Sequence, residues 1–260
     1  HNNFRLNEFL KRFDFKYNFH SATDLYRTGF FNNGLKKVLF NYDKIKNIVL
    51  PTLGKERRTT YSPFLPICRR TKRVLEVKIE EINTKDSSII YMDNESKKYQ
   101  EVSILDGNCK LQWKVDWAMR WFVLEVDYEM NGKDLIESFL LSSKINKVLG
   151  GIPPTNLTYE LFLDANGEKI SKSIGNGISV DDWLKFSPKE SLKLFMFQSP
   201  KKAKRLFFDV IPKVTDEFIK FKNIYPQQNE IDRFNNPIWF IDDSSFELLP
   251  DNLSFNMILN

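Results

Sequence analysis

The stretch Val126–Gly151, VDYEMNGKDLIESFLLSSKINKVLGG, indicates the class of fold. Residues 126–130 predict a short strand, and a glycine turn follows it. Asp134 is a good N-cap for the next helix, with Glu137 at the capping-box position, and Gly150 marks the end of that helix. A strand, a glycine turn and a helix in this order form half of a βαβ unit, in which ligands bind beyond the ends of the strands. The stretch therefore predicts an α/β fold with a binding site near the turn.

Helices dominate the expected structure upstream of this stretch, and strands follow them. The expected elements are an amphipathic helix over residues 3–14, a short strand over 15–19, a helix opened by a capping box at Ser21 and one long helix over 33–50. Three β-rich runs come next, at residues 74–79, 88–92 and 99–105, with a hairpin turn at Asp93-Asn94. We therefore expect a mainly helical portion over residues 1–66 and a small β insertion over residues 67–105.

A further helix over residues 113–124 precedes the opening stretch, and residues 106–163 form the second half of the expected α/β domain. A polar loop then begins at residue 164, and two helix starts follow, at Ser179 and at Ser187-Pro188. Residues 200–221 predict a helix that breaks or kinks at Pro212. Loop and helices make up a region over residues 164–225, and residues 226–260 begin a C-terminal region rich in Asn, Asp and Pro.

The composition limits the class of protein. The chain of 260 residues carries 39 Lys and Arg against 34 Asp and Glu, a formal charge of +5, and 42% of its residues are hydrophobic. That content suffices for a buried core, so intrinsic disorder is not expected. No run approaches the length of about 18 apolar residues that a membrane span needs. Two cysteines far apart, Cys68 and Cys109, favour a reducing, cytosolic setting.

The loop Gly167–Gly177, GEKISKSIGNG, is the strongest chemical signal in the chain. It carries two lysines three residues apart, Lys169 and Lys172, together with Ser171 and Ser173. A mobile cationic loop of this kind can fold over a triphosphate and meet the charge that develops as pyrophosphate leaves, since lysine acts as a compact point charge. Taken without its neighbours, the same pattern also fits a solvated surface loop.

The neighbouring sequence narrows these alternatives. Lys169–Ser173 resembles the "KMSKS" loop of class I aminoacyl-tRNA synthetases. Four longer strings are similar to the class I (archaeal-type) lysyl-tRNA synthetase in its bacterial branch: Cys109–Trp121, Tyr159–Asp164, Gly177–Leu184 and Phe195–Lys213. This resemblance covers nearly the whole chain. It implies a partial Rossmann-type catalytic domain with a small β insertion, followed by helices of the region around the KMSKS loop that contacts the tRNA stem.

The resemblance also implies a reaction. Lysine and ATP, with Mg²⁺ on the phosphates, would give lysyl-adenylate and pyrophosphate, and the lysyl group would pass to tRNA(Lys) in the cytoplasm. Lys172 and Lys169 are then the expected catalytic residues, with Lys172 the first choice for contacting ATP. Ser171 and Ser173 are expected to shape the ATP-binding loop. The resemblance implies neither DNA nor a membrane as a partner.

Three residues are candidates for the lysine pocket. Trp113 resembles an aromatic wall of the family's lysine site, where its π-face would meet an ammonium group, although a Trp of the hydrophobic core is an equal alternative. Asp116 is a candidate partner for the substrate ammonium, with an ordinary ion pair or a helix cap as the alternative. Asp134 lies at the strand-to-helix turn where the family places substrate contacts. Archaeal relatives often have His at the next position, which is Leu135 here.

Four cations within five residues are candidates for tRNA contacts: Lys201, Lys202, Lys204 and Arg205. As phosphate contacts they would position the tRNA without reading its sequence, and a solvated charged face is the alternative. Some relatives bind zinc near the β insertion that Cys68 and Cys109 flank. Two isolated cysteines do not complete a tetrahedral site, so no metal is expected there.

The other class I motif, a His-x-Gly-His-like turn, does not occur around His1 or His20. We therefore expect an internal piece of a longer enzyme, which lacks that motif and the C-terminal anticodon-binding domain. The alternative is the inactive product of a split or decayed synthetase gene, at most a weak tRNA-binding module. A third alternative is another class I synthetase, such as a glutamyl enzyme, and the four long strings argue against it.

Overall fold

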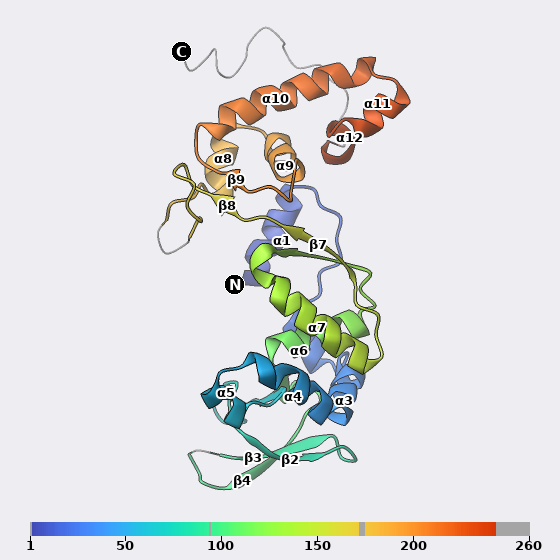
Figure 1. Ribbon diagram of the computed structural model, residues 1–260, viewed down its shortest axis with the longest axis vertical. Coiled ribbons are helices and arrows are strands. Elements are labelled where there is room, and N and C mark those ends of the chain that lie inside the picture. The colour runs from blue at the N-terminus through green and yellow to red at the C-terminus, as the bar shows by residue number, and fades with distance from the viewer. Residues whose placement is uncertain (1, 94, 172–174, 243–260) are drawn as a thin grey trace. The chain divides into compact units, whose positions relative to one another are not determined.

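The computed structural model describes residues 2–93, 95–171 and 175–242 (Figure 1). The chain divides into two compact units, His1–Leu157 and Thr158–Asn260. The first unit begins with helices α1 (Asn2–Arg12), α2 (Ala22–Arg27), α3 (Asn32–Phe40), α4 (Tyr42–Val49) and α5 (Lys55–Thr60), with a 3₁₀ turn η1 (Leu50–Thr52) before α5.

The expected amphipathic helix at the start of the chain is confirmed as α1, and the cap at Ser21 is confirmed because its hydroxyl accepts a hydrogen bond from the Asp24 amide at 3.4 Å. The strand expected over residues 15–19 is wrong. These residues are extended but pair with no strand among the described residues, and the rings of Phe15 and Phe19 are exposed. An isolated extended segment has no neighbouring backbone to complete a ladder.

The single long helix expected over residues 33–50 is also wrong, because Asn41 separates α3 from α4. Asn41 leaves the helical region, with φ −102° and ψ 21°, and its side-chain amide donates to the Lys37 carbonyl at 3.0 Å. Asparagine competes for backbone hydrogen bonds in this way and so interrupts helices. The apolar spacing was nevertheless informative, since Leu35 on α3 and Ile45 on α4 are both fully buried.

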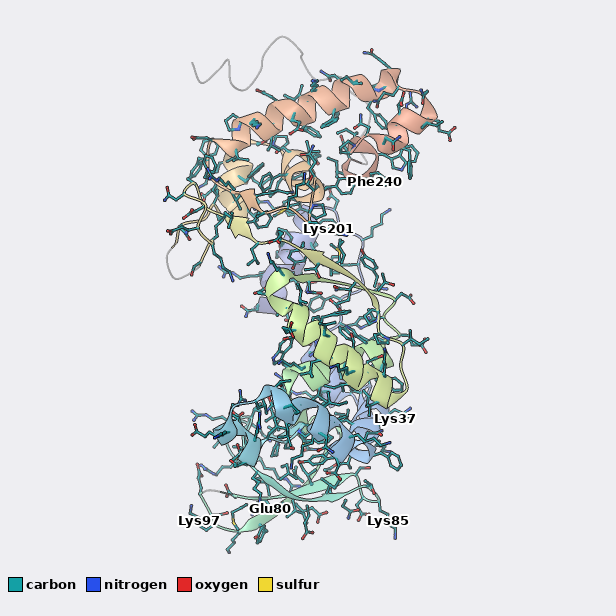
Figure 2. All side chains as sticks on the ribbon, viewed as in Figure 1. Lys37, Glu80, Lys85, Lys97, Lys201 and Phe240 are labelled. Carbon is teal, nitrogen blue, oxygen red and sulfur yellow. The ribbon has the colours of Figure 1, made fainter. Side chains whose placement is uncertain are left out.

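The predicted β insertion corresponds to a three-stranded antiparallel sheet in the order β2 (Ile79–Asn83), β3 (Ser88–Met92) and β4 (Tyr99–Ser103). Lys85 and Lys97 lie in its two turns (Figure 2). The run at residues 74–79 does not form a full strand. Val74 makes only an isolated bridge to Ile67, and pairing with β3 begins at Ile79.

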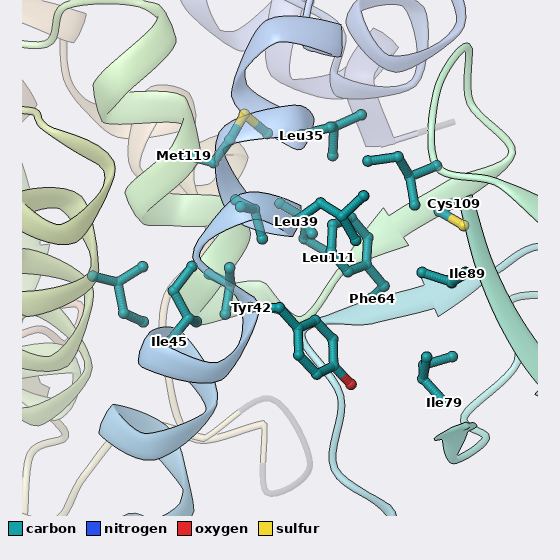
Figure 3. Packing of buried hydrophobic residues seen from close by; sticks show 14 of the residues in the cluster. Leu35, Leu39, Tyr42, Ile45, Phe64, Ile79, Ile89, Cys109, Leu111 and Met119 are labelled. Atoms are coloured by element: carbon teal, nitrogen blue, oxygen red, sulfur yellow. The ribbon is translucent and has the colours of Figure 1, made fainter. Parts of the chain in front are cut away.

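The sheet packs into one hydrophobic core with the helices and with a second antiparallel pair, β1 (Phe64–Pro66) and β5 (Cys109–Leu111) (Figure 3). Ile89 of the sheet and Phe64 of β1 are fully buried in this core. Helix α6 (Trp113–Val123) supplies Met119 to the same cluster. Residues 67–105 are therefore stabilised by the same buried apolar area as the helices around them.

A strand–helix–strand unit follows α6 and confirms the α/β class. It consists of β6 (Tyr128–Gly132), a 3₁₀ turn η2 (Lys133–Leu135), helix α7 (Ile136–Leu149) and β7 (Thr155–Tyr159), and β6 pairs with β7. Gly150 ends α7 with φ +90°, as expected for a glycine C-cap. The N-cap prediction is wrong, because Leu135 holds the cap position without a side-chain bond and Asp134 lies inside the 3₁₀ turn.

The second unit contains a parallel pair, β8 (Phe162–Leu163) and β9 (Lys204–Arg205), and a set of helices. The helices are α8 (Val180–Phe186), α9 (Lys189–Phe197), α10 (Val210–Ile224), α11 (Glu230–Asn235) and α12 (Ile238–Ile241), with a 3₁₀ turn η3 (Tyr225–Gln227) before α11. Ser179 caps α8 as expected, with its hydroxyl 3.0 Å from the Asp182 amide. Pro188, expected as the first residue of α9, instead occupies its N-cap position.

The helix expected over residues 200–221 is wrong in its first half, where β9 and a turn precede α10. Pro212 lies in the first turn of α10, so the helix continues past it. The first amides of a helix have no intrahelical acceptor, and a proline there removes no hydrogen bond. Among the described residues, no helix combines the length and apolarity that crossing a membrane requires.

We predict that Gly34→Ala weakens the packing of α3 on α6. An added methyl group would lie 2.6 Å from Val123 Cγ2 and 2.8 Å from Met119 Sδ. Alanine is the better helix former by about 1 kcal/mol, but overpacking a core costs about 1–3 kcal/mol. Hydrogen–deuterium exchange of the peptides covering α3 and α6 should therefore become faster.

Gly54→Ala is the matched control, because a Cβ at Gly54 would meet no atom within 4 Å. Exchange in α3 and α6 should stay unchanged in that variant. Equal exchange in the Gly34→Ala variant and the parent protein would contradict the predicted overpacking.

Candidate functional site

The lysine-containing loop of the second unit is held at its first end by Asp164, which directly follows β8. One carboxylate oxygen accepts the backbone amides of Asn166 and Glu168, each at 2.9 Å. The other accepts the side-chain amide of Asn176 at 2.7 Å. These bonds favour the charged form, so the Glu168 amide first, and then Asn176, lowers the pKa of the buried Asp164 carboxyl.

Asn176 fastens the other end of the loop. Its Oδ1 accepts the Ser171 amide at 3.0 Å while its Nδ2 donates to Asp164. The Gly175 amide donates to the Ser171 carbonyl at 3.0 Å, and Gly175 has φ +70°, which favours glycine. Asp164 and Asn176 therefore join the two arms of the loop at its base. This frame of Asp164 and Asn176 is called the loop clamp below.

Neither clamp residue was predicted to have a role from the sequence. A local signal was present, because Asp-x-Asn-Gly over residues 164–167 is turn chemistry in which the aspartate accepts following amides. The partnership of Asp164 with Asn176, twelve positions away, leaves no comparable pattern in the sequence.

The loop residues predicted to act on ATP come between the two clamp residues in the sequence. Lys169 is exposed, and its backbone forms an isolated bridge to Leu163. Ser171 is half-buried, with its amide held by Asn176. Lys172 and Ser173 lie outside the described residues, so their predicted roles remain predictions.

Trp113, the first lysine-pocket candidate, opens α6 and is 48% exposed, so it is not a core residue. Its ring stacks on Trp117 at 5.5 Å, and Trp117 in turn contacts Trp121 at 4.9 Å. Both of these inner rings donate their indole N–H to one oxygen of Glu129 on β6, at 3.2 and 2.7 Å. Trp113 is thus the open end of an aromatic stack whose inner members are fixed by hydrogen bonds.

Asp116, the second candidate, is buried and has protein partners. One carboxylate oxygen accepts the Tyr26 hydroxyl at 2.5 Å, and the other pairs with Arg120 one turn along α6. Burial, and then the Asp116 charge, raises the pKa of the Tyr26 hydroxyl. Asp134, the third candidate, is exposed in the turn before α7. None of the three candidates forms a hydrogen bond, ion pair or ring contact with another in the described structure.

The predicted tRNA-binding cluster divides into two kinds of residue. Lys201 (Figure 2), Lys202 and Arg205 are exposed. Lys204 instead turns toward the C-terminal end of α9, where its ammonium donates to the carbonyls of Phe195 and Met196 and lies 5.0 Å from the Phe195 ring centre. Burial lowers the pKa of Lys204. Its charge stabilises the helix end rather than a surface patch.

The two cysteines line the same pocket of the first unit, which is discussed further below. Cys109 is fully buried, and burial raises the pKa of its thiol to about 12. Cys68 is half-buried and accepts the Thr71 amide at 3.4 Å. The described residues contain no group of three His, Cys, Asp or Glu placed to hold a metal ion. The expected absence of zinc remains a prediction.

We predict that Asn176→Ala opens the loop, because Asn176 accepts the Ser171 amide and donates to Asp164 at the same time. Losing a buried hydrogen-bonded partner costs about 1–3 kcal/mol, which corresponds to a local increase in amide exchange of about 5- to 150-fold. Asn166→Ala is the control, since only the backbone amide of Asn166 serves Asp164. Equal exchange over residues 164–177 in both variants would rule the clamp out.

The clamp should also respond to pH in one direction. Because the folded pKa of Asp164 is lowered, its contribution to stability is complete above the ordinary Asp pKa of about 4 and is lost as pH falls through the folded value. Exchange in the loop should therefore rise on acidification below about pH 4, after correction for the intrinsic exchange rate, and Asn176→Ala should weaken that response.

Comparison with known proteins gives the family. The chain matches the sequence model of the family described as tRNA synthetases class I (K) over residues 1–245. It is 53% identical over 240 residues to the lysine–tRNA ligase of Rickettsia akari (strain Hartford), which covers 92% of this chain and 45% of that protein. It is 50% identical over 260 residues to the lysine–tRNA ligase of Rickettsia felis (strain ATCC VR-1525 / URRWXCal2), covering 99% of this chain and 49% of that protein.

A third lysine–tRNA ligase, from Rickettsia africae (strain ESF-5), is 49% identical over 260 residues and is covered to 50% of its length. The chain therefore spans about half the length of the curated relatives it matches. A family match over residues 1–245 together with about 50% identity to these relatives confirms the resemblance found in the sequence. The chain belongs to the class I lysyl-tRNA synthetases.

Proposed function

We propose that the protein containing this chain activates lysine with ATP and transfers the lysyl group to tRNA(Lys), in the cytoplasm. The lysine-containing loop with its clamp carries the proposal, because Asp164 and Asn176 hold the base of the loop while Lys169 stays exposed. The names of the Rickettsia relatives support the choice of lysine. ATP enters as its Mg²⁺ complex, which is the substrate. The strand–helix–strand unit from β6 to β7 fits a Rossmann-type domain.

The loop lysines would act on the phosphates. Adenylate formation breaks the bond between the α- and β-phosphates, and negative charge accumulates on the departing pyrophosphate. Lys172 and Lys169 would stabilise this charge, and a preorganised donor of this kind is worth about 3 kcal/mol in the transition state. The clamp limits the conformations of the loop, so less entropy is lost when the lysines meet the phosphates. Ser171 and Ser173 would shape the turn that carries them.

Trp113 and Asp134 are the stronger candidates for the lysine site, because both are exposed. The open face of the Trp113 ring suits an ammonium or the methylene chain of the substrate. Asp134 offers an exposed carboxylate in the turn before α7, where an opposite charge would meet the ammonium. Asp116 ranks third, since Tyr26 and Arg120 already occupy its two oxygens. We propose Lys201, Lys202 and Arg205 as tRNA phosphate contacts and assign Lys204 to the end of α9.

The alternative function is a non-catalytic piece that binds tRNA weakly. It is favoured by one sequence observation, the missing His-x-Gly-His-like turn, which in class I synthetases holds ATP from the side opposite the lysine loop. Under the first proposal the longer protein catalyses lysine-dependent ATP–pyrophosphate exchange, whereas under the alternative it does not. Measuring this exchange therefore separates the two.

We predict that Lys172→Ala in the longer protein lowers the rate of lysine-dependent ATP–pyrophosphate exchange by about 10²–10³-fold, with tRNA present, because it removes one donor to the leaving group. The KM for lysine should change by less than about threefold, since this charge acts in the transition state. Lys97→Ala is a control of the same type on an exposed turn of the β sheet. A rate and a lysine affinity that fall together would count against the assigned role.

We also predict that the purified 260-residue chain has negligible exchange activity with lysine, MgATP and tRNA supplied, because one half of the ATP site has no counterpart in its sequence. The longer protein, assayed in parallel, should be active. Robust exchange by the 260-residue chain would refute this prediction, and inactivity of both proteins would favour the non-catalytic alternative.

A further inference from the structure

A pocket of about 530 Å³ in the first unit has a strongly positive lining. Five cationic side chains contribute to it: Arg27, Arg69, Lys72, Lys110 and Arg120. The only carboxylate in the lining is that of Asp106, which accepts the side-chain amide of Asn32 at 2.8 Å. All of these residues lie within the first unit. The lysine-containing loop and the cations around Lys201 belong to the second unit.

Most of this charge has no counterion among the described residues. Arg120 pairs with Asp116. For Arg27, Arg69, Lys72 and Lys110, no ion pair with a carboxylate is found in the part of the chain that the structure describes, and all four side chains are exposed. Four such cations around one pocket raise the local concentration of anions.

The turn that carries two of these cations is built by specific contacts. The Cys68 amide donates to the Arg73 carbonyl and the Lys72 amide to the Cys68 carbonyl, both at 2.8 Å. Lys72 closes the turn with φ +57°, a left-handed conformation that favours glycine or asparagine. A lysine held in this conformation costs about 1 kcal/mol.

Another part of the pocket lining is formed by Arg27 and by residues 106–108, which pack against it. Gly107 has φ +76°, and a Cβ there would lie 3.1 Å from Arg27 Cγ and 3.3 Å from its Cα. Glycine thus lets the backbone of residues 106–108 approach the arginine closely. Arg27 and the turn at Cys68–Arg73 face the pocket from different segments, so both segments bring charge to one place.

We propose that this pocket binds a phosphate group of an RNA strand. Arginine and lysine recognise phosphate by charge and by bidentate hydrogen bonds. The only aromatic residue of the lining, Tyr26, is buried with its hydroxyl bound to Asp116, so no exposed ring is offered for stacking a base. The contact would therefore position RNA without reading its sequence.

Two observations favour an RNA strand over a free phosphate ion. Arg73 adds a further cation past the pocket on the same turn, as a chain of successive phosphates would require, and no ion pair of Arg73 with a carboxylate is found among the described residues. Arg70 beside it pairs with Glu95. The pocket is also open enough that the four charged groups stay exposed. The inference concerns binding alone and does not depend on lysine activation.

The test uses the longer protein that contains this chain, with Arg69→Glu/Lys72→Glu as the pocket variant. The control is Lys85→Glu/Lys97→Glu, which makes the same change of net charge at the two turns of the β2–β4 sheet (Figure 2). Fluorescence anisotropy at several salt concentrations measures the Kd for unfractionated tRNA. The pocket variant should bind at least about tenfold more weakly, with a salt slope lower by about 2, whereas the control should change less than about threefold.

A second variant, Lys72→Gly, separates charge from folding. Glycine adopts φ +57° without strain, so the turn should be kept while the cation is lost. It should weaken tRNA binding by about threefold or more and leave the thermal unfolding midpoint unchanged or higher. Equal losses of tRNA affinity in the pocket and control variants would overturn the proposal, because net charge alone would then explain them.

A parallel titration with inorganic phosphate at constant ionic strength distinguishes the source of the phosphate. For an RNA site, millimolar phosphate should displace little tRNA, and ³¹P NMR should show no saturable binding that Arg69→Glu/Lys72→Glu removes. Saturable binding of phosphate that this variant abolishes, without a loss of tRNA affinity, would overturn the RNA assignment and place a free phosphate in the pocket.

Discussion

The buried carboxylate of Asp116 is the interaction on which the first unit depends most directly. A buried charge must be paired and hydrogen-bonded, or its desolvation destabilises the fold. Asp116 meets this requirement with Tyr26 from α2 and with Arg120 from its own helix. The Tyr26 hydroxyl also accepts the Leu111 amide of β5 at 3.3 Å. One carboxylate thus ties α2, β5 and α6 together, and Arg120 extends from it to the basic pocket.

The same rule organises the loop of the second unit. Asp164 is buried at the end of β8 and is satisfied by backbone amides and by Asn176. The loop can therefore keep a defined base while Lys169 remains at the surface. In both units a buried carboxylate fixes the local structure, through the side chains of Tyr26 and Arg120 at Asp116 and through backbone amides and Asn176 at Asp164.

Charge matters in this protein where it is uncompensated, not as a total. The net charge of +5 is small for 260 residues. Lys204 is directed into the protein, and Arg70 and Arg57 pair with Glu95 and Glu76. The turn at Cys68–Arg73 has four cations within residues 69–73, the same density as at Lys201–Arg205, yet the sequence predicted a binding role only for the latter. The turn differs in lining a pocket, and no pattern in the neighbouring sequence predicts that pocket.

The sequence by itself determined the family, the α/β class and those elements that local chemistry decides. The Ser21 and Ser179 caps, the strand at Ser88–Met92 and the glycine end of α7 were predicted because each depends on residues within a few positions. Tertiary structure decided the rest. The break at Asn41, the inward turn of Lys204 and the partners of Asp116 and Asp164 depend on groups brought together from elsewhere in the chain, or on a local competition that burial resolves. Hydrogen bonding and desolvation act on neighbours in space, and only the folded chain defines those neighbours.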